Sequence, residues 1–180
     1  MNPNDLVAHI PSLRRYARVL TGDAWAADDL VQDTLERACR KWRLWIVGTD
    51  LRAWLFTLMH NLHVSDVRRA YRRTSAGTAV DLDAVAGELQ APVSEHALAM
   101  DLQRCLLRLP HDQRSVLLLV CLEDMSYAQV ARVTGAPVGT VMSRLSRARS
   151  RLQALMNPPE SQPAGTSNEH PPAPPLRRLK

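Results

Sequence analysis

Serine and arginine side chains gather on one side of residues 136–155, "APVGTVMSRLSRARSRLQAL". The apolar residues of this stretch recur at steps of three and four, which predicts a helix with one buried stripe. They are Val138, Val141, Leu145, Ala148, Leu152 and Leu155. Guanidinium groups and small hydroxyls on the opposite side suit contacts to phosphate oxygens and to base edges. An ordinary solvated face is the alternative interpretation.

The segment "SYAQVARVTG" lies directly before this basic helix. Ser126 is a residue type that caps the first amides of a helix, and Gly135 is suited to the left-handed conformation that ends one. Pro137 fits the first turn of the following helix, where a missing amide costs little. A capped short helix, a glycine turn and a longer basic helix together predict a helix-turn-helix, with an ordinary helix corner as the alternative.

Composition predicts an all-α protein. The chain has 180 residues, of which 46% are hydrophobic and only 4% aromatic, with long 3.6-period segments and almost no alternating runs. The net charge of +5 favours an acidic partner such as nucleic acid. No signal peptide or membrane span is evident, so we expect a cytoplasmic protein with no membrane insertion of its own. Cys39, Cys105 and Cys121 are odd in number and widely spaced, which predicts buried reduced thiols.

The helical periodicity divides the chain into two small helical domains joined by a flexible linker. The first domain spans residues 1–73, and the second spans residues 95–156 and contains the helix-turn-helix. Residues 74–94 between them are rich in Gly, Ser, Pro and acidic side chains, which is typical of a linker. Residues 157–180 are rich in proline and polar residues, so we expect a disordered tail.

Two further groups in the first domain could do chemistry. Asp29, Gln32, Asp33 and Glu36 form an acidic face with no evident basic partner at helical spacing, so its acceptors are directed outward. His60 and His63 stand three residues apart and could share a metal ion. The alternatives are a solvated acidic face and two ordinary helix residues.

Three blocks together resemble a known family. They are "DDLVQDTLERACRKW", "LRAWLFTLMHNLHVSDVRR" and "LPHDQRSVLLLVCLEDMSYAQVARVTGAPVGTVMSRLSRARSRL", and they occur in one order along the chain. This order is similar to that of bacterial RNA polymerase sigma factors of the extracytoplasmic-function group. The resemblance implies a first domain that binds RNA polymerase core and melts the minus-10 promoter element, and a second domain that reads the minus-35 element.

The resemblance also implies functional residues. Polymerase binding falls on Asp29, Gln32, Asp33 and Glu36. Minus-10 recognition falls on Trp45, Asn61, Arg68 and Arg69, and Trp45 and Asn61 would hold a flipped base, although core packing is the alternative for Trp45. Minus-35 recognition falls on Thr140, Ser143, Arg144, Ser146, Arg147 and Arg151, with Arg144 and Arg147 projecting from the exposed side of the helix. Met142 and Thr57 replace residues that are often basic in the family, and Ser146 is smaller than its usual counterpart, which leaves the promoter sequence open.

Three classes of function are weighed on these observations. A sigma factor accounts for both the basic helix and the acidic face, and the resemblance implies control by an anti-sigma partner. A free-standing helix-turn-helix regulator has no need of the acidic face. A metal-dependent enzyme would use Asp28, Asp29 and the histidine pair, but no nucleophile or phosphate-binding loop accompanies them. We therefore expect no enzymatic activity and no cofactor.

Overall fold

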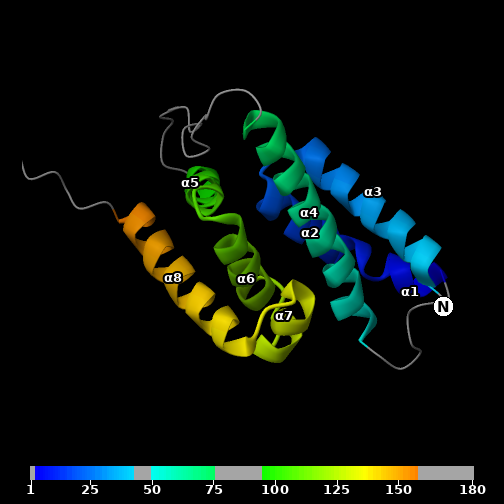
Figure 1. Ribbon diagram of the computed structural model, residues 1–180. Coiled ribbons are helices and arrows are strands. Elements are labelled where there is room, and N and C mark those ends of the chain that lie inside the picture. The colour runs from blue at the N-terminus through cyan, green and yellow to red at the C-terminus, as the bar shows by residue number, and fades with distance from the viewer. Residues whose placement is uncertain (1–2, 43–49, 76–94, 158–180) are drawn as a thin grey trace, which may run out of the picture.

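The computed structural model describes residues 3–42, 50–75 and 95–157, and every regular element in these ranges is a helix (Figure 1). The first half of the molecule, residues 3–75, contains α1 (Pro3–Val7), α2 (Ile10–Thr21), α3 (Ala24–Lys41) and α4 (Leu51–Ser75). The second half, residues 95–157, contains α5 (Glu95–Leu107), α6 (His111–Cys121), α7 (Tyr127–Thr134) and α8 (Val138–Met156). This confirms the all-α fold. Most of the predicted linker and tail lies outside the described residues.

The predicted helix ends are confirmed by their capping geometry. Gly22 ends α2 with φ of 77°, and the Asp23 carboxylate accepts a hydrogen bond of 2.7 Å from a first-turn amide of α3. Ser126 and Gln129 form a reciprocal capping box at the start of α7, and Gly135 ends that helix with φ of 65°. Local sequence therefore determines where these helices begin and end.

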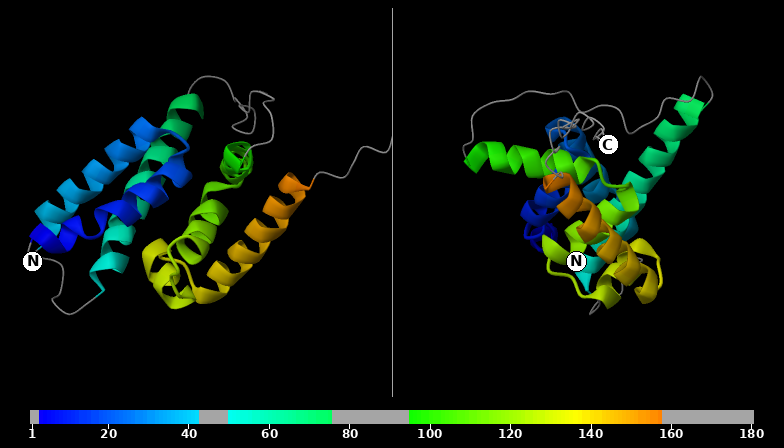
Figure 2. Two further views of the ribbon diagram at one scale, coloured as in Figure 1. Left: turned by 180° about the vertical axis from the view of Figure 1, so that it is seen from behind. Right: turned by 90° about the vertical axis from the view of Figure 1, so that its left-hand side faces the viewer.

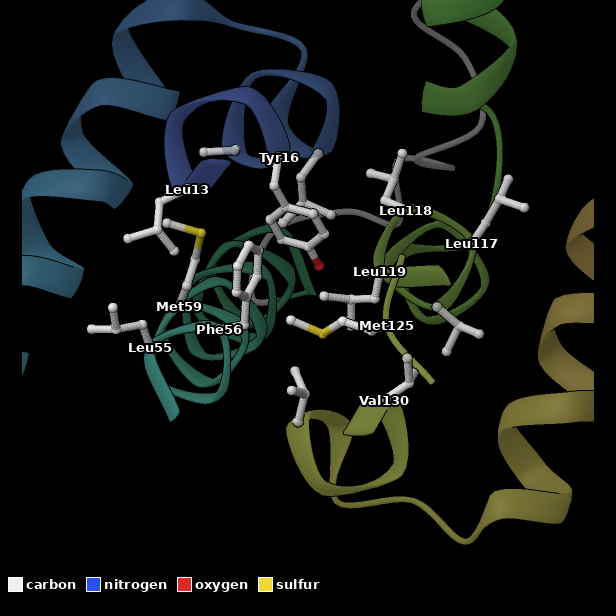
Figure 3. Packing of buried hydrophobic residues seen from close by; sticks show 14 of the residues in the cluster. Leu13, Tyr16, Leu55, Phe56, Met59, Leu117, Leu118, Leu119, Met125 and Val130 are labelled. Carbon is white, nitrogen blue, oxygen red and sulfur yellow. The ribbon is translucent and has the colours of Figure 1, made fainter. Parts of the chain in front are cut away.

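The two halves pack directly against each other, which the helical periodicity did not predict. Helix α4 contacts α7, and α2 contacts both α5 and α6 (Figure 2). Figure 3 shows Tyr16 and Phe56 of the first half facing Leu119 and Met125 of the second half. The Tyr16 and Phe56 rings meet edge to face, with centroids 5.2 Å apart. A single cluster of buried apolar side chains thus extends through both halves.

The two outermost helices carry the predicted acidic face and the predicted minus-35 reader, whereas Asn61, Arg68 and Arg69 lie on α4. Helix α3 lies on one flank of the molecule and α8 on the opposite flank, with α4 and α6 between them (Figures 1 and 2). None of the helices in the described ranges combines the length and the apolar character that crossing a bilayer requires. The interior helices therefore fix the relative position of two separate exposed faces.

The prediction of buried thiols is wrong for two of the three cysteines. Cys39 and Cys121 are exposed, and Cys105 is half-buried; all three are free. Cys39 follows the buried Ala38 by one position, so it is rotated about 100° away from the apolar stripe of α3. Cys121 is the last residue of α6, where the helix emerges from the core.

Candidate nucleic-acid and polymerase interfaces

The helix-turn-helix is built from α7 and α8. Val130 and Val133 bury the inner side of α7, and Val141, Leu145 and Ala148 bury the inner stripe of α8. Packing of α8 against both α6 and α7 fixes its rotation about its own axis. The serine and arginine side of α8 is consequently held toward the outside, as the periodicity predicted.

Half of the six predicted minus-35 residues are fully exposed on that outer side. Ser146, Arg147 and Arg151 are exposed, whereas Thr140 and Ser143 are half-buried. The Ser143 hydroxyl donates a 3.0 Å hydrogen bond to the Thr140 carbonyl, which holds it close to the helix backbone. Among the described residues, neither Arg147 nor Arg151 has an ion-pair partner. Their guanidinium groups stand one turn apart and are available to phosphate oxygens or base edges.

Arg144 departs from the expectation that it projects from the exposed side. Its Nε lies 3.0 Å from Asp112 Oδ2 at the start of α6, and only 29% of its side chain is exposed. Position 144 precedes 147 by three residues, so it is rotated about 60° from Arg147, toward α6. In this arrangement Arg144 ties α8 to α6 and reaches DNA only if the pair with Asp112 breaks. The sequence offered no signal for this partner.

The minus-10 candidates lie on α4. Asn61, Ser65, Arg68 and Arg72 recur at steps of four, three and four, and all four are exposed, so they form one polar stripe along the helix. Arg69 lies beside this stripe, 3.8 Å from Asp66. Trp45 and the rest of the loop before Asp50 lie outside the described residues. The structure therefore places Asn61 and the arginines on one helix but does not test the slot for a flipped base.

His60 and His63 lie on the side of α4 that is near the second half; His60 is buried and His63 is half-buried. Burial lowers the pKa of each imidazole from 6.5 to about 4, with smaller contributions from His111 and from arginines of α6 and α8. No third metal-binding side chain joins them within the described ranges. The two histidines therefore lie near charged groups of α6 and α8, whereas Asn61 is exposed.

The acidic face of α3 is exposed, as predicted, but part of it is paired. Glu36 Oε2 lies 3.1 Å from Arg40 Nη2, and the Gln32 amide donates a 3.5 Å hydrogen bond to Glu36. The expectation of no basic partner at helical spacing is therefore wrong for Glu36. Asp29 and Asp33 form no ion pair with any described residue, so their carboxylates remain open to a partner.

A groove runs between α2 and α3 beside this acidic face. It is lined by Ile10, Arg14, Asp28, Val31, Gln32, Leu35, Glu36 and Cys39. Arg14 Nε and Asp28 Oδ1 are 2.9 Å apart across its lining. Apolar side chains next to carboxylates favour a binding site for a protein partner over a face that contacts only water. Sequence reasoning missed Arg14, whose side chain pairs with a residue fourteen positions away.

Family models match both halves of the chain. Residues 6–60 match the family described as the Sigma2 domain of PhyR, and residues 99–152 match Sigma-70, region 4. The chain is 41% identical over 153 residues to the ECF RNA polymerase sigma factor EcfG of Rhodopseudomonas palustris, covering 85% of this chain and 83% of that protein. It is 32% identical over 148 residues to SigM of Mycobacterium tuberculosis, covering 82% and 73%.

A solved structure is similar as well. The sigma factor RpoE of Bartonella quintana, determined in complex with the anti-sigma factor NepR, superposes with a TM-score of 0.70 at 34% identity. The match covers 87% of this chain and 96% of that one. With the two region matches in the expected order and relatives of this similarity along most of the chain, the protein belongs to the extracytoplasmic-function sigma factors of bacterial RNA polymerase.

Proposed function

We propose that this sigma factor binds RNA polymerase core through the acidic face of α3, opens the promoter at the minus-10 element with Asn61 and the loop before Asp50, and reads the minus-35 element with α8. The supporting observation is the pair of surfaces on opposite flanks. One carries the unpaired carboxylates of Asp29 and Asp33, and the other the unpaired guanidinium groups of Arg147 and Arg151 among the described residues. A free-standing regulator would need only the basic surface.

At the minus-35 element, we assign Arg147 and Arg151 to direct contact with DNA. A guanidinium group donates two parallel hydrogen bonds to a guanine edge or binds phosphate oxygens, and each good contact contributes about 1–3 kcal/mol. Thr140, Ser143 and Ser146 line the same face with small groups, so the duplex can approach the helix closely. Arg144 would contact DNA only if its ion pair with Asp112 breaks.

At the minus-10 element, we assign base capture to Asn61 with Trp45, and backbone contacts to Arg68 and Arg69. A carboxamide donates and accepts hydrogen bonds at once, which suits the edge of an unpaired base. Asn61 and Arg68 are seven residues apart on one face of α4, which separates their Cα atoms by about 10 Å along the helix axis. That spacing allows one strand to contact both residues.

We also propose that an anti-sigma protein controls this chain, as the complex of the Bartonella quintana relative with NepR suggests. The groove beside Asp28 and Gln32 and the neighbouring unpaired carboxylates form a surface that a protein partner could cover. Such a partner would compete with the polymerase for the same face. Both partners place the protein in the cytoplasm, and neither role calls for a cofactor or for catalysis.

Asn61→Ala tests base capture. The variant should bind core and minus-35 DNA like the wild type but form an open complex poorly on a fully paired promoter, because the unpairing cost is no longer offset by the base contact. A template mismatched across the minus-10 element should restore most of the transcription. Permanganate footprinting on both templates measures this difference.

Gln153→Ala is the matched control, since it removes an exposed carboxamide from the last turn of α8. It should transcribe both templates like the wild type. Equal defects of Asn61→Ala on the paired and mismatched templates, together with a lowered melting temperature, would mean that Asn61 acts only in packing.

A further inference from the structure

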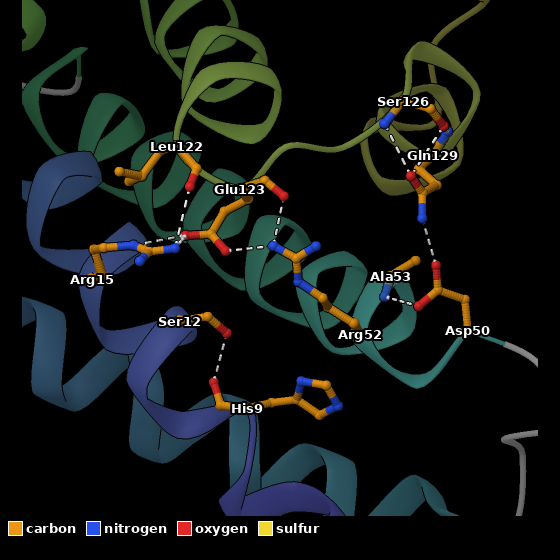
Figure 4. A network of polar contacts seen from close by, with 10 residues as sticks. All are labelled: His9, Ser12, Arg15, Asp50, Arg52, Ala53, Leu122, Glu123, Ser126 and Gln129. Carbon is orange, nitrogen blue, oxygen red and sulfur yellow. Dashed lines mark hydrogen bonds and ion pairs between the residues drawn. The ribbon is translucent and has the colours of Figure 1, made fainter.

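The loop between α6 and α7 places a carboxylate inside the contact between the two halves. Glu123 is 1% exposed, and the partners of its carboxylate among the described residues come from the first half (Figure 4). Arg15 Nη2 of α2 lies 2.9 Å from Glu123 Oε1, and Arg52 Nη2 of α4 lies 2.7 Å from Oε2. Each oxygen of one carboxylate is thus paired with a different helix of the opposite half.

The same two arginines also bind the backbone of this loop. Arg15 donates a 3.2 Å hydrogen bond to the Leu122 carbonyl, and Arg52 donates one of 2.6 Å to the Glu123 carbonyl. The Arg52 guanidinium lies over the Phe56 ring, 5.6 Å from its centroid, and this contact orients it. The loop is therefore recognised through both its side chain and its main chain.

A second polar link lies nearby. The Gln129 amide of α7 donates a 2.7 Å hydrogen bond to Asp50 Oδ2, at the start of α4. Gln129 also completes the capping box with Ser126, so this link joins the first helix of the helix-turn-helix to the segment that precedes α4. Arg52 and Asp50 both belong to the start of α4, so the two polar links hold the second half against the beginning of the helix that carries Asn61.

The buried charge of Glu123 makes the contact between the two halves depend on the two arginines that pair with it. Removing the carboxylate from water is unfavourable, and the closed arrangement offsets this cost only while both arginines are in place. The side chains of Arg15 and Arg52 keep 55% and 33% exposure in the closed arrangement, so both guanidinium groups remain partly hydrated while they hold Glu123. When the halves separate, all three groups return to water. The ion pairs can therefore form and break reversibly without leaving a buried charge unpaired.

The closed molecule is smaller than the distance between the two promoter elements that it would have to contact. Elements centred at minus-10 and minus-35 are about 25 base pairs apart, or about 85 Å along B-DNA at 3.4 Å per base pair. A compact chain of 180 residues has a radius of gyration of about 16 Å, and hence a diameter of about 40 Å. The closed chain cannot reach both elements together, so the halves must separate on the promoter.

We propose that Glu123, held by Arg15 and Arg52, is a latch that keeps the two halves of the free protein closed and thereby inhibits promoter binding. The inhibitory consequence rests on the proposed function, whereas the latch itself does not. Binding of core polymerase would then have to supply the free energy that breaks these contacts.

The test measures the distance between the halves in the full chain. One spin label is attached to the exposed Cys39 on α3 and a second to a cysteine introduced by Gln153→Cys on α8, with Cys105→Ser and Cys121→Ser removing the other thiols. Pulsed electron paramagnetic resonance should give a single distance for the background protein, shorter than the distance in molecules whose halves have separated. Glu123→Gln keeps the side-chain volume but removes the charge, and it should raise the ratio of open to closed molecules roughly tenfold.

Asp124→Asn is the matched control. Asp124 is the exposed neighbour of Glu123, with φ of 48°, a conformation that asparagine adopts readily. It removes the same charge one position away and should leave the short distance unchanged. The Arg15→Gln and Arg52→Gln double variant leaves the carboxylate buried without partners, so it should open at least as far as Glu123→Gln.

Short distances for both Glu123→Gln and the double arginine variant would overturn the latch. Circular dichroism identifies any variant that loses helix. If one of the two variants does, the distance measured in the variant that keeps its helices tests the latch. Opening without a gain in affinity for a duplex carrying both promoter elements would overturn the inhibitory role. Transcription by the wild-type holoenzyme on that promoter tests the proposed function separately.

Discussion

The buried histidine pair should make the free energy of unfolding depend steeply on pH between 7 and 5. Burial against α6 lowers the pKa of His60 and of His63 from 6.5 to about 4, so the folded protein holds both imidazoles neutral. In this range the unfolded chain binds protons that the folded chain does not. Stability is therefore present above pH 6.5 and is lost as the pH falls from 6.5 toward 4.

The size of the effect follows from the two pKa values. Between pH 7 and pH 5, each histidine accounts for a loss of about 2 kcal/mol, and the pair for about 4 kcal/mol if the sites titrate independently. The cationic groups around them, Arg114 of α6 and Arg144 of α8, oppose protonation, and so does His111, whose pKa is also lowered by burial. No carboxylate is among the causes acting on either imidazole, so the direction of the effect is set by burial and by like charge.

Urea unfolding of the full chain at pH 7, 6 and 5, followed by circular dichroism, measures this dependence. The His60→Gln and His63→Gln double variant has no imidazole at either position, so it should lose about 4 kcal/mol less than the wild type over the same range. Each single variant should recover about half of the difference. Parallel curves for the wild type and the double variant would refute the assignment, whatever their absolute stabilities.

Three further changes test other surfaces. Arg147→Ala should weaken minus-35 binding by about 1–3 kcal/mol in a fluorescence anisotropy titration, and binding equal to that of the wild type would remove this residue from the reader. Charge reversal by Asp29→Arg and Asp33→Arg together should abolish assembly with core polymerase while helix content stays constant, because both side chains are exposed. Gly22→Ala should destabilise the protein by about 1–3 kcal/mol in thermal unfolding, because φ is 77° there and an added Cβ would lie 2.5 Å from a Leu107 methyl group.

Local features of the fold were predictable because they depend on neighbouring residues. Single residue types predict the helix ends, namely the caps at Asp23 and Ser126 and the left-handed glycines Gly22 and Gly135. The spacing of apolar residues predicts the buried stripe of α8. These features specify helix ends and inner faces without knowledge of the partner helix. Asn61 is exposed as well, but the family resemblance and not the period of α4 singled it out.

Pairings between distant residues were not predictable in this way. Arg144 resembles Arg147 in the sequence, yet it binds Asp112, which is 32 positions away, and only the crossing of α6 and α8 brings the two together. Glu123 looks like a surface acid in a turn, yet it is buried by two arginines more than 70 positions away. The spacing of apolar residues predicts which face of a helix points inward, but it does not predict which half of the molecule packs against that face.

The contact between the halves also contains polar groups that a permanent core would exclude. The buried atoms without a hydrogen-bond partner among the described residues include His60 Nδ1 and His63 Nε2 of α4 and Arg114 Nε of α6. An unsatisfied buried polar group costs about 1–3 kcal/mol, and separating the halves returns such groups to water. Burial also raises the pKa of Tyr16 and lowers that of Arg114, which are signs of the same cost. The apolar contacts around Phe56 favour the closed arrangement while these groups oppose it, so a binding partner needs to supply only the difference to separate the halves.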